Sequence, residues 1–412
     1  MGKRNRTNEH PRKASGRDSE SGFTLLEALV ALVVMIVVLV GLLSLLQLNS
    51  RVAKAQINVA GMQQSLRVAH ATMIRELRMT GRGGLPAFRP ATGTYDGIFL
   101  PQGLAVGVRN NVQPGTPIGG AGSPDVLAGT DVLTIRGVFT APLYQINAAE
   151  DGVIGNTGAD KIIIRGLSPG GLEQPLDALE AAIQSGLPEA LLLIGSADDS
   201  IQAVVELTGG AEVDGGWQVN FTTAGTHGAQ YLHLSPNGEF PSTLTSVAAV
   251  GILEEYRYYV RDAAPAPRLA VARFYPGTDA EYGGAGAGNL AVDVADNIID
   301  LQLALGIDRN LSGAIDEAEN ALDDDWLFNA EDDDPDPDDT AEWNQPDRRL
   351  FYLRITTLAR TDRIDLDYLS PPIEAIEDHV YGEAEAPAAG EELERKYRRR
   401  LLQTVVDLRN VL

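Results

Sequence analysis

The sequence contains no cysteine among its 412 residues. Disulfide bridges, cysteine-ligated zinc sites and a thiol nucleophile are therefore excluded. Histidine is scarce as well, with five in the whole chain, and the sequence holds no His-Glu-x-x-His, G-x-S-x-G or phosphate-binding glycine motif. These absences remove the usual signatures of catalysis, so we expect a chain that is not an enzyme.

Basic residues are also fewer than acidic ones. Lys and Arg number 33 against 57 Asp and Glu, which gives a net charge of −24, so nucleic-acid binding through a basic face is not expected. The first 22 residues differ, because they hold six Lys and Arg against three acidic residues. Positive charge before an apolar segment keeps that end in the cytoplasm, and we therefore expect the acidic remainder to be exported.

One long apolar run interrupts this polar chain. The 19 residues from Ala28 to Leu46 carry no charge, and Ser44 is their only polar side chain. That length suits a membrane-spanning helix. A cleaved secretory signal is a poor alternative, because no A-x-A-like site ends the run. A plain signal anchor fits the hydropathy but does not explain Gly22-Phe23 or the carboxylate of Glu27 at the edge of the run.

The segment FTLLEALVAL, which follows Gly22, resembles the class III signal of type IV pilins and pseudopilins. The resemblance implies that a prepilin peptidase cuts between Gly22 and Phe23, that Phe23 is N-methylated, and that the apolar run stays on the mature chain. It also implies that Glu27 neutralises the N-terminal amine of a neighbouring subunit during filament assembly. A carboxylate near hydrocarbon costs about a few kcal/mol unless it is paired. The alternative is an interfacial side chain that reaches back to water.

A helical pattern continues beyond the apolar run. Apolar residues recur at steps of three and four, which places them on one helix face, and a glycine cluster at 81–84 then gives a stop signal. We predict one helix from Phe23 to about Thr80, with the stripe packed on the chain's own sheet; a homomeric coiled coil is the alternative. The stripe consists of Val52, Ala55, Val59, Met62, Leu66, Ala69, Met73 and Leu77.

The remainder of the chain predicts a β-rich head. Residues 81–128 are rich in Gly, Pro, Asn and Thr and indicate loops, and short β-favouring runs separated by turn residues follow. Strands are expected within 129–140, 161–167, 190–196, 201–207, 217–223, 231–235, 247–263, 268–277, 350–360 and 400–412, with a short helix within 176–188.

Three stretches of the chain, MIRELRMTGRGG (73–84), SPDVLAGTDVLTIRG (123–137) and YRRRLLQTVVDLRN (397–410), resemble PilW-type minor pilins. The resemblance implies an α+β, pilin-like fold, in which a long N-terminal membrane-spanning helix packs on a large β-rich head with irregular loops. It also implies that the C-terminal strand closes the sheet.

A possible calcium loop lies at Asp308–Glu319. The order of oxygen-bearing residues matches an EF-hand loop with Ser at position 5, and Gly313 at position 6 permits the turn. The preceding residues favour a strand, so we expect a calcium loop outside an EF-hand fold; a polar turn with chance acidic spacing is the alternative. The expected ligands are the side chains of Asp308, Asn310, Ser312, Asp316 and Glu319 and the carbonyl of Ala314.

Two charged runs follow. The acidic stretch 323–344 is expected to form a solvated loop that could add a second calcium site. The basic run from Arg395 to Arg400 could be a nucleic-acid or phospholipid patch. It is better explained as a solvated or salt-bridged face in a very acidic chain.

These observations predict a leader at 1–22, a long helix at 23–80 and an exported head at 81–412 that includes an acidic insertion at 308–345. The resemblance implies a PilW-like minor pilin that initiates or caps a type IV pilus, stored in the inner membrane with its N-terminus cytoplasmic. Expected partners are the prepilin peptidase, other minor and major pilins and membrane lipid. Alternatives are a J-type pseudopilin of type II secretion, a calcium-dependent pilus-tip adhesin and, more remotely, an anchored enzyme.

Overall fold

The computed structural model describes most of the chain from Thr24 to Leu408. The described residues are 24–85, 87, 105–120, 122–146, 152–155, 160–184, 191–196, 202–222, 243–244, 247–264, 266–279, 281–282, 291–308, 312–315, 325–329, 350–387 and 391–408. The described chain contains antiparallel sheets that follow one long helix, which confirms the predicted α+β class.

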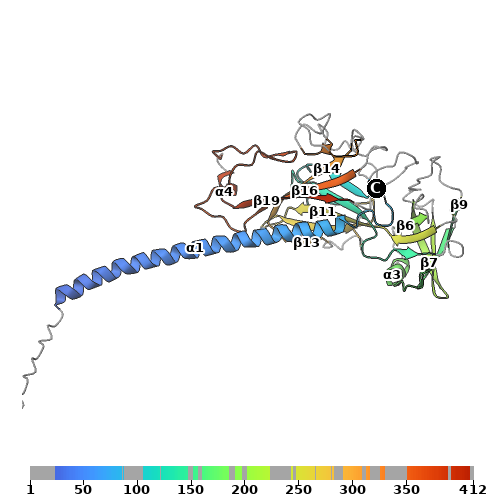
Figure 1. The fold of residues 1–412 in the computed structure, drawn as a ribbon, viewed down its shortest axis with the longest axis horizontal. Helices are drawn as coiled ribbons and strands as arrows, with labels where there is room; N and C mark the ends of the chain where they lie inside the picture. The colour runs from blue at the N-terminus through green and yellow to red at the C-terminus, as the bar shows by residue number, and fades with distance from the viewer. Residues whose placement is uncertain are drawn as a thin grey trace, which may run out of the picture. The chain divides into compact units, whose positions relative to one another are not determined.

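Helix α1 runs without a break from Leu25 to Leu77, over 53 residues (Figure 1). It ends three residues before the predicted Thr80, and the chain then turns through Gly81, whose positive φ of 75° suits glycine. The chain divides into two compact units, residues 1–57 and 58–412. The helix contributes its apolar half to the first unit and its amphipathic half to the second.

A five-stranded antiparallel sheet forms one part of the second unit. Its central hairpin pairs Arg261 with Arg268, which confirms the two long strands expected around that turn. The strand order is β1-β2-β11-β12-β13. The bounds are Val106–Arg109 for β1, Val132–Gly137 for β2, Glu254–Arg261 for β11, Arg268–Phe274 for β12 and Val292–Asp296 for β13.

An eight-stranded sheet carries the short helix α3, Asp177–Gln184, which lies within the predicted range and buries Leu179 and Ala182. The strand order is β3-β10-β6-β7-β8-β5-β4-β9. The bounds are Tyr144–Gln145 for β3, Gly152–Gly155 for β4, Asp160–Arg165 for β5, Leu191–Ser196 for β6, Gln202–Val213 for β7, Gly216–Thr222 for β8, Thr243–Leu244 for β9 and Val247–Ile252 for β10.

A four-stranded sheet with the order β15-β14-β16-β19 completes the head, and β19 pairs with β16 over its whole length. The C-terminal strand therefore forms an edge of this sheet. The bounds are Ile298–Ile307 for β14, Trp326–Leu327 for β15, Leu350–Arg360 for β16 and Arg399–Asp407 for β19, with the hairpin β17, Ala375–Ile376, and β18, His379–Val380, and the helix α4, Glu391–Arg395.

Two sequence predictions were wrong in detail. The single strand expected over 247–263 is two strands, because β10 pairs with β6 whereas β11 pairs with β2 in another sheet. Buried Glu254 fixes this change of sheet by accepting hydrogen bonds from the backbone N–H groups of Phe139 and Thr140. The stretch 323–344 is not a solvated loop throughout, since residues 325–328 are buried and Trp326–Leu327 forms β15. The predicted strand at 231–235 lies outside the described residues.

One hydrophobic core joins α1 to the three larger sheets. Side chains from the helix, the five-stranded sheet, the eight-stranded sheet and the four-stranded sheet belong to a single buried cluster. A second, smaller cluster lies around Ile118 and Phe274 on the other side of the five-stranded sheet. At about 25 cal/mol per Å² of apolar surface, such burial is the main favourable contribution to folding.

Candidate functional site

The start of α1 is a capping box. Oγ1 of Thr24 accepts a hydrogen bond from the backbone N–H of Glu27 at 3.3 Å, and Oε2 of Glu27 accepts one from the backbone N–H of Thr24 at 3.4 Å. This reciprocal pair satisfies backbone donors that the first helical turn leaves unbonded. Glu27 therefore has a local structural role in the single chain, in addition to the assembly role that the resemblance implies for it.

The apolar half of α1 exposes its side chains all round. An 18-residue window of the helix has a mean hydropathy of 3.3, and none of it is buried within the described structure. Ser44 donates its hydroxyl to the carbonyl of Val40 at 2.8 Å, so the single polar side chain of the run is bonded within the helix. The helix is long and apolar enough to cross a membrane.

The amphipathic half of α1 packs on the head, as predicted for most of the stripe. The exceptions are Val52, which is exposed, and Ala55, which is half-buried but outside the buried cluster; both lie in the first compact unit. The helix also buries His70, which the apolar pattern did not include; its ring nitrogens lie 2.7 Å from Oγ1 of Thr357 and 3.0 Å from Oγ1 of Thr404. The buried stripe consists of Met62, Leu66, Ala69, Met73 and Leu77, with Val59 partly buried.

His70 thus joins the helix to the last two strands of the four-stranded sheet. Thr357 lies on β16 and Thr404 on β19, and the two residues are on adjacent strands. Burial lowers the pKa of His70 to about 4, although a backbone hydrogen bond with Leu402 opposes this. The imidazole is therefore neutral at pH 7, with one nitrogen as donor and the other as acceptor.

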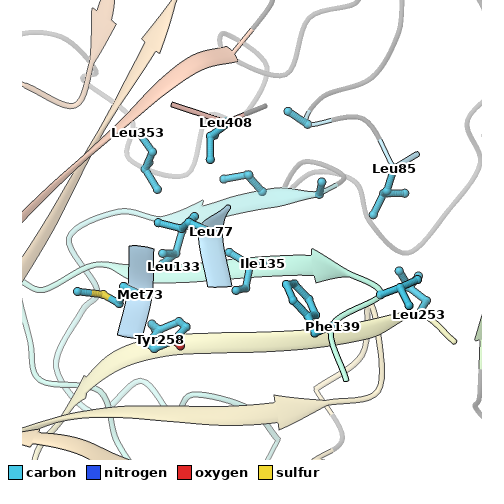
Figure 2. Packing of buried hydrophobic residues seen from close by; sticks show 14 of the residues in the cluster. Met73, Leu77, Leu85, Leu133, Ile135, Phe139, Leu253, Tyr258, Leu353 and Leu408 are labelled. Atoms are coloured by element: carbon cyan, nitrogen blue, oxygen red, sulfur yellow. The ribbon is translucent and has the colours of Figure 1, made fainter. Parts of the chain in front are cut away.

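The C-terminal end of α1 is fixed to the five-stranded sheet (Figure 2). Met73 and Leu77 pack against Leu133 and Ile135 of β2. Beyond the helix, the backbone N–H of Gly81 donates to the carbonyl of Arg136 at 2.9 Å. Two of the stretches that resemble PilW-type pilins, 73–84 and 123–137, therefore contact each other.

Gly137 is needed at this contact because the two backbones approach closely. A Cβ at Gly137 would lie 3.2 Å from the backbone nitrogen of Gly81 and 3.3 Å from the carbonyl of Met79. Both neighbours are backbone atoms, so they cannot move aside as a flexible side chain can. Packing therefore explains why the stretch 123–137 ends in a glycine.

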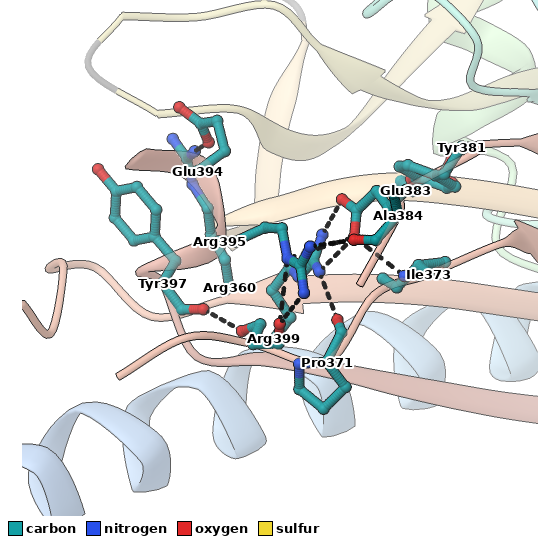
Figure 3. A network of polar contacts seen from close by, with 12 residues as sticks. Arg360, Pro371, Ile373, Tyr381, Glu383, Ala384, Glu394, Arg395, Tyr397 and Arg399 are labelled. Carbon is teal, nitrogen blue, oxygen red and sulfur yellow. Dashed lines mark hydrogen bonds and ion pairs between the residues drawn. The ribbon is translucent and has the colours of Figure 1, made fainter. Parts of the chain in front are cut away.

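The basic run 395–400 forms a bonded network with the preceding loop (Figure 3). Arg399 makes two hydrogen bonds with Glu383, at 2.6 and 2.7 Å, and a third with the carbonyl of Pro371. Buried Arg395 donates to the carbonyls of Ser370 and Ala384. These contacts confirm the salt-bridged interpretation of the run and hold the loop before α4 against β19.

The N-terminal segment decides what kind of chain this is. A protein-family model described as the prokaryotic N-terminal methylation motif matches residues 17–43. The N-terminal segment is type IV pilin-like. The motif implies processing by a prepilin peptidase and assembly with pilins, and pilin-like proteins are generally structural subunits without catalytic activity. Together with the exposed apolar helix, it is consistent with a membrane-anchored and then pilus-associated protein.

Other comparisons add little. Among solved structures, a type IV-like pilin from Thermus thermophilus is similar at 12% identity over 57% of this chain and 94% of that chain, with a TM-score of 0.18. An overlap as low as this carries no argument about the head. Among curated proteins, no relative matches the chain.

The expected site residues of this pilin-like chain are described only in part. Gly22 and Phe23 lie outside the described residues, as do Asn310, Asp316 and Glu319 of the expected calcium loop. Asp308, Ser312, Gly313 and Ala314 are described, and they follow β14 directly. The processing positions and the calcium ligands therefore remain predictions.

The described part of the expected calcium loop turns around the carboxylate of Asp308. Its two oxygens accept the backbone N–H groups of Ser312, at 2.9 Å, and of Gly313, at 2.8 Å. Gly313 has a positive φ of 82°, which glycine adopts without strain. The element before the loop is a strand, as expected, so an EF-hand with a helix on each side is excluded.

Three residues that fix the start of α1 or join α1 to the head were not predicted from the sequence. Thr24 could have been found, because Thr followed three residues later by Glu is the sequence sign of a capping box. His70 and Tyr258 left no such sign. Their hydrogen bonds join positions far apart in sequence, namely His70 to Thr357 and Tyr258 to Glu76.

Proposed function

We propose that the chain is a PilW-like minor pilin, a non-enzymatic subunit that helps to initiate or cap a type IV pilus. The observation that carries the proposal is Glu27, held by Thr24 at the start of an exposed apolar helix within the methylation motif. A carboxylate in that position needs a cationic partner once the helix lies in lipid or among other helices. The amine of Phe23 on a neighbouring subunit would provide one.

The head supports a subunit role. The amphipathic half of α1 is fixed by a buried stripe, by His70 and by Glu76, so the head is held firmly to the second half of the helix. The bonded loop 361–385 and the edge strand β19 then present the surface that would contact partner subunits. A J-type pseudopilin of type II secretion would use the same parts, with other minor pseudopilins as its partners.

The first test is mass spectrometry of the intact chain and its N-terminal peptide from native membranes. A chain that begins at N-methylated Phe23 is the expected result. A chain that keeps residues 1–22 would contradict the proposal and leave a signal-anchored surface protein. Gly22→Val should block processing, whereas Gly16→Val, a matched change elsewhere in the leader, should leave it intact.

A second test distinguishes a minor pilin of a type IV pilus from a pseudopilin of type II secretion. Deletion of the gene should reduce the number or change the length of pili in the minor-pilin case. Unchanged pili together with loss of a secreted protein would instead favour the pseudopilin. Unchanged pili and unchanged secretion would contradict both.

We further propose that the loop beginning at Asp308 binds calcium and that the pilus tip carries a calcium-dependent binding function. The specific support is the turn around Asp308, in which the first expected ligand is already oriented by Ser312 and Gly313. The remaining oxygens would come from Asn310, Asp316 and Glu319 and from the carbonyl of Ala314. Glu319→Gln should abolish calcium-dependent attachment and leave pili intact, whereas Glu317→Gln, two residues earlier in the sequence, should have little effect. Attachment that is insensitive to both variants would contradict a calcium-dependent adhesin.

A further inference from the structure

The last strand of the head has an open edge. β19 pairs with β16 on one side, and no other strand in the described part of the chain pairs with it on the other side. Edge strands of natural proteins are often blocked by proline, by a bulge or by a covering segment. β19 contains no proline, and its pairing with β16 has no register shift from Arg399 to Asp407. The edge is therefore regular enough to accept another strand.

The backbone groups at this edge belong to the odd-numbered residues. The carbonyl of Arg398 and the backbone N–H of Leu408 are both hydrogen-bonded on the side of β16. Because successive residues of a strand direct their backbone groups to opposite sides, the even-numbered residues of β19 bond to β16. Leu401, Gln403 and Val405 therefore direct their N–H and C=O groups outwards, where no strand of the described chain pairs with them.

The side chains of the same three residues lie on the face of the sheet that is turned away from α1. The opposite face is the one on which Thr404 contacts His70 of the helix. Leu401 is 44% exposed and Val405 is 50% exposed, although both are apolar. Outward backbone groups beside exposed apolar side chains are what a strand-addition site presents, because the backbone gives affinity and the side chains give specificity.

We propose that β19 of one copy pairs antiparallel with β19 of a second copy, across a two-fold axis at Gln403. Gln403 then lies opposite its counterpart, and Leu401 of each copy lies opposite Val405 of the other, so that the exposed apolar side chains cover each other. These are the residues whose backbone groups point outwards, so each pair exchanges both N–H···O bonds. Val405 of the second copy also covers a groove of about 360 Å³ beside Leu401, lined mainly by residues 370–376 and 399–401.

The charges of the strand favour this antiparallel pairing over a parallel one. β19 begins with two basic residues, Arg399 and Arg400, and ends with the acidic Asp407. In the antiparallel arrangement, the basic start of one strand lies beside the acidic end of the other. A parallel arrangement would place like charges opposite each other, which destabilises a pair of strands. The ends of β19 are therefore complementary to a second copy of the same strand in the reverse direction.

The position of α1 leaves room for the second copy. His70 contacts both Thr357 of β16 and Thr404 of β19, so the helix lies over the boundary between these two strands. In the paired sheet, the two copies of α1 would be separated by two strand spacings, or about 10 Å, which is a distance at which helices pack. Pairing at β19 therefore covers the open edge without forcing the helices into each other.

This pairing joins copies that point in opposite directions. Within the head, residues 58–77 of α1 and the strand β19 both run away from the end at which α4 lies (Figure 1). Antiparallel pairing of β19 therefore makes these parts of the two helices antiparallel as well. Copies anchored in one membrane have helices that point the same way, so the contact would join heads from two filaments or two cells. This last step rests on the proposed pilin function, whereas the pairing of the heads does not.

The absence of cysteine from the chain makes the register of the pairing directly testable. The experiment oxidises single-cysteine variants of the full chain in detergent with copper phenanthroline, at about 0.15 M salt, where charges more than about 8 Å apart are largely screened. Gln403→Cys should form a disulfide-linked homodimer, because the Cα atoms of such a pair lie about 5.5 Å apart, within the range that a disulfide spans. Leu401→Cys should not cross-link to itself but should cross-link to Val405→Cys when the two chains are mixed. A monomeric Gln403→Cys chain, or equal cross-linking of Leu401→Cys to itself, would overturn the proposed register.

Sedimentation of the chain without a cysteine covers the case in which Gln403→Cys does not fold. The wild type should sediment as a dimer and Val405→Lys as a monomer, because the lysine would be covered by Leu401 of the second copy. Val292→Lys is the matched control, since Val292 is 62% exposed on the edge strand β13, and it should stay dimeric. A monomeric wild type, or a Val405→Lys chain that is still dimeric, would overturn the proposal. Neither result bears on the processing at Phe23, which tests the pilin function separately.

Discussion

The hydroxyl of Tyr258 lies 2.5 Å from Oε2 of Glu76, so a hydrogen bond joins the last turn of α1 to β11. Burial raises the pKa of Tyr258 well above its ordinary value, and the charge of Glu76 raises it further. The phenol therefore keeps its proton and acts as the donor. The bond fixes the end of the helix on the sheet at the point where Met73 and Leu77 enter the core.

Replacing Tyr258 with Phe should lower the free energy of unfolding by about 1–3 kcal/mol, because the carboxylate of Glu76 then loses its buried donor. Urea denaturation of the full chain in detergent measures the change. Tyr352→Phe is the matched control, since Tyr352 is 36% exposed on β16, and it should have little effect. Equal unfolding midpoints for the two variants would show that the bond does not stabilise the junction.

His70 predicts a pH dependence of stability. Burial lowers its pKa to about 4 in the folded chain, against about 6.5 in an unfolded chain. The neutral imidazole is therefore favoured by folding. Its contribution is fully present above pH 6.5 and is lost as the pH falls from 6.5 towards 4, by up to about 3 kcal/mol.

The comparison of wild type with His70→Gln isolates this contribution, because glutamine stays neutral and can still reach a threonine hydroxyl. Denaturant unfolding at pH 7.5 and pH 4.5 measures the four stabilities. The wild type should lose more stability on acidification than the variant does. An equal loss in both chains would show that other acidic groups, such as Asp378, account for the whole pH dependence.

Local patterns predicted the elements of this fold better than their connections. The 3–4 spacing of apolar residues identified the buried stripe of α1, and β-favouring runs found β2, β12, β16 and β19. The same rule joined β10 and β11 into one strand, because both contain β-favouring residues and nothing at Leu253 signals a change of sheet. Strand exchange between sheets is decided by long-range pairing, which periodicity does not record.

The residues of the candidate site likewise fall into those that local sequence predicts and those that only the fold brings together. Glu27 and the apolar run are local features, so the sequence identified them, and Thr24 was within reach of the same reasoning. The contacts of His70 with Thr357 and Thr404 were not, because these residues are far apart in the sequence. Only the folded arrangement of α1, β16 and β19 brings their side chains together.

The two proposed roles of Glu27 can be separated by mutation. Gln is accepted at this position of a capping box, so Glu27→Gln should keep the helix start and remove only the charge. If the charge pairs with the amine of a neighbouring subunit, the variant should be processed and stored in the membrane at wild-type level but be absent from sheared filaments. Immunoblots of membrane and filament fractions provide the measurement.

Thr24→Ala is the complementary control, because it removes the cap, at a cost of about 1 kcal/mol to the helix, and leaves the charge. This variant should still enter filaments. If the Glu27→Gln variant instead reached the filament fraction at wild-type level, the cap, and not the charge, would be the reason for a carboxylate at this position.

The buried ion pair around Glu255 gives the strongest stability prediction. Its oxygens lie 2.6 Å from Nε of Arg136 and 2.8 Å from Nη2 of Arg257, and all three side chains are buried. Although burial alone would raise the pKa of Glu255, the two guanidinium groups lower it below its ordinary value. The carboxylate is therefore ionised and balances two buried positive charges.

Glu255→Gln should destabilise the head by about 3–5 kcal/mol, because buried Arg136 loses this carboxylate and buried Arg257 keeps only the exposed Asp279 as a counter-charge. Asp279→Asn provides the matched control. Asp279 also pairs with Arg257, at 2.9 Å, but its side chain is 71% exposed, so its loss should cost at most about 1 kcal/mol. Thermal and urea unfolding of the two variants test the difference. Similar losses would mean that solvent reaches Glu255 and that the arginines are hydrated, in which case the five-stranded sheet does not depend on this pair.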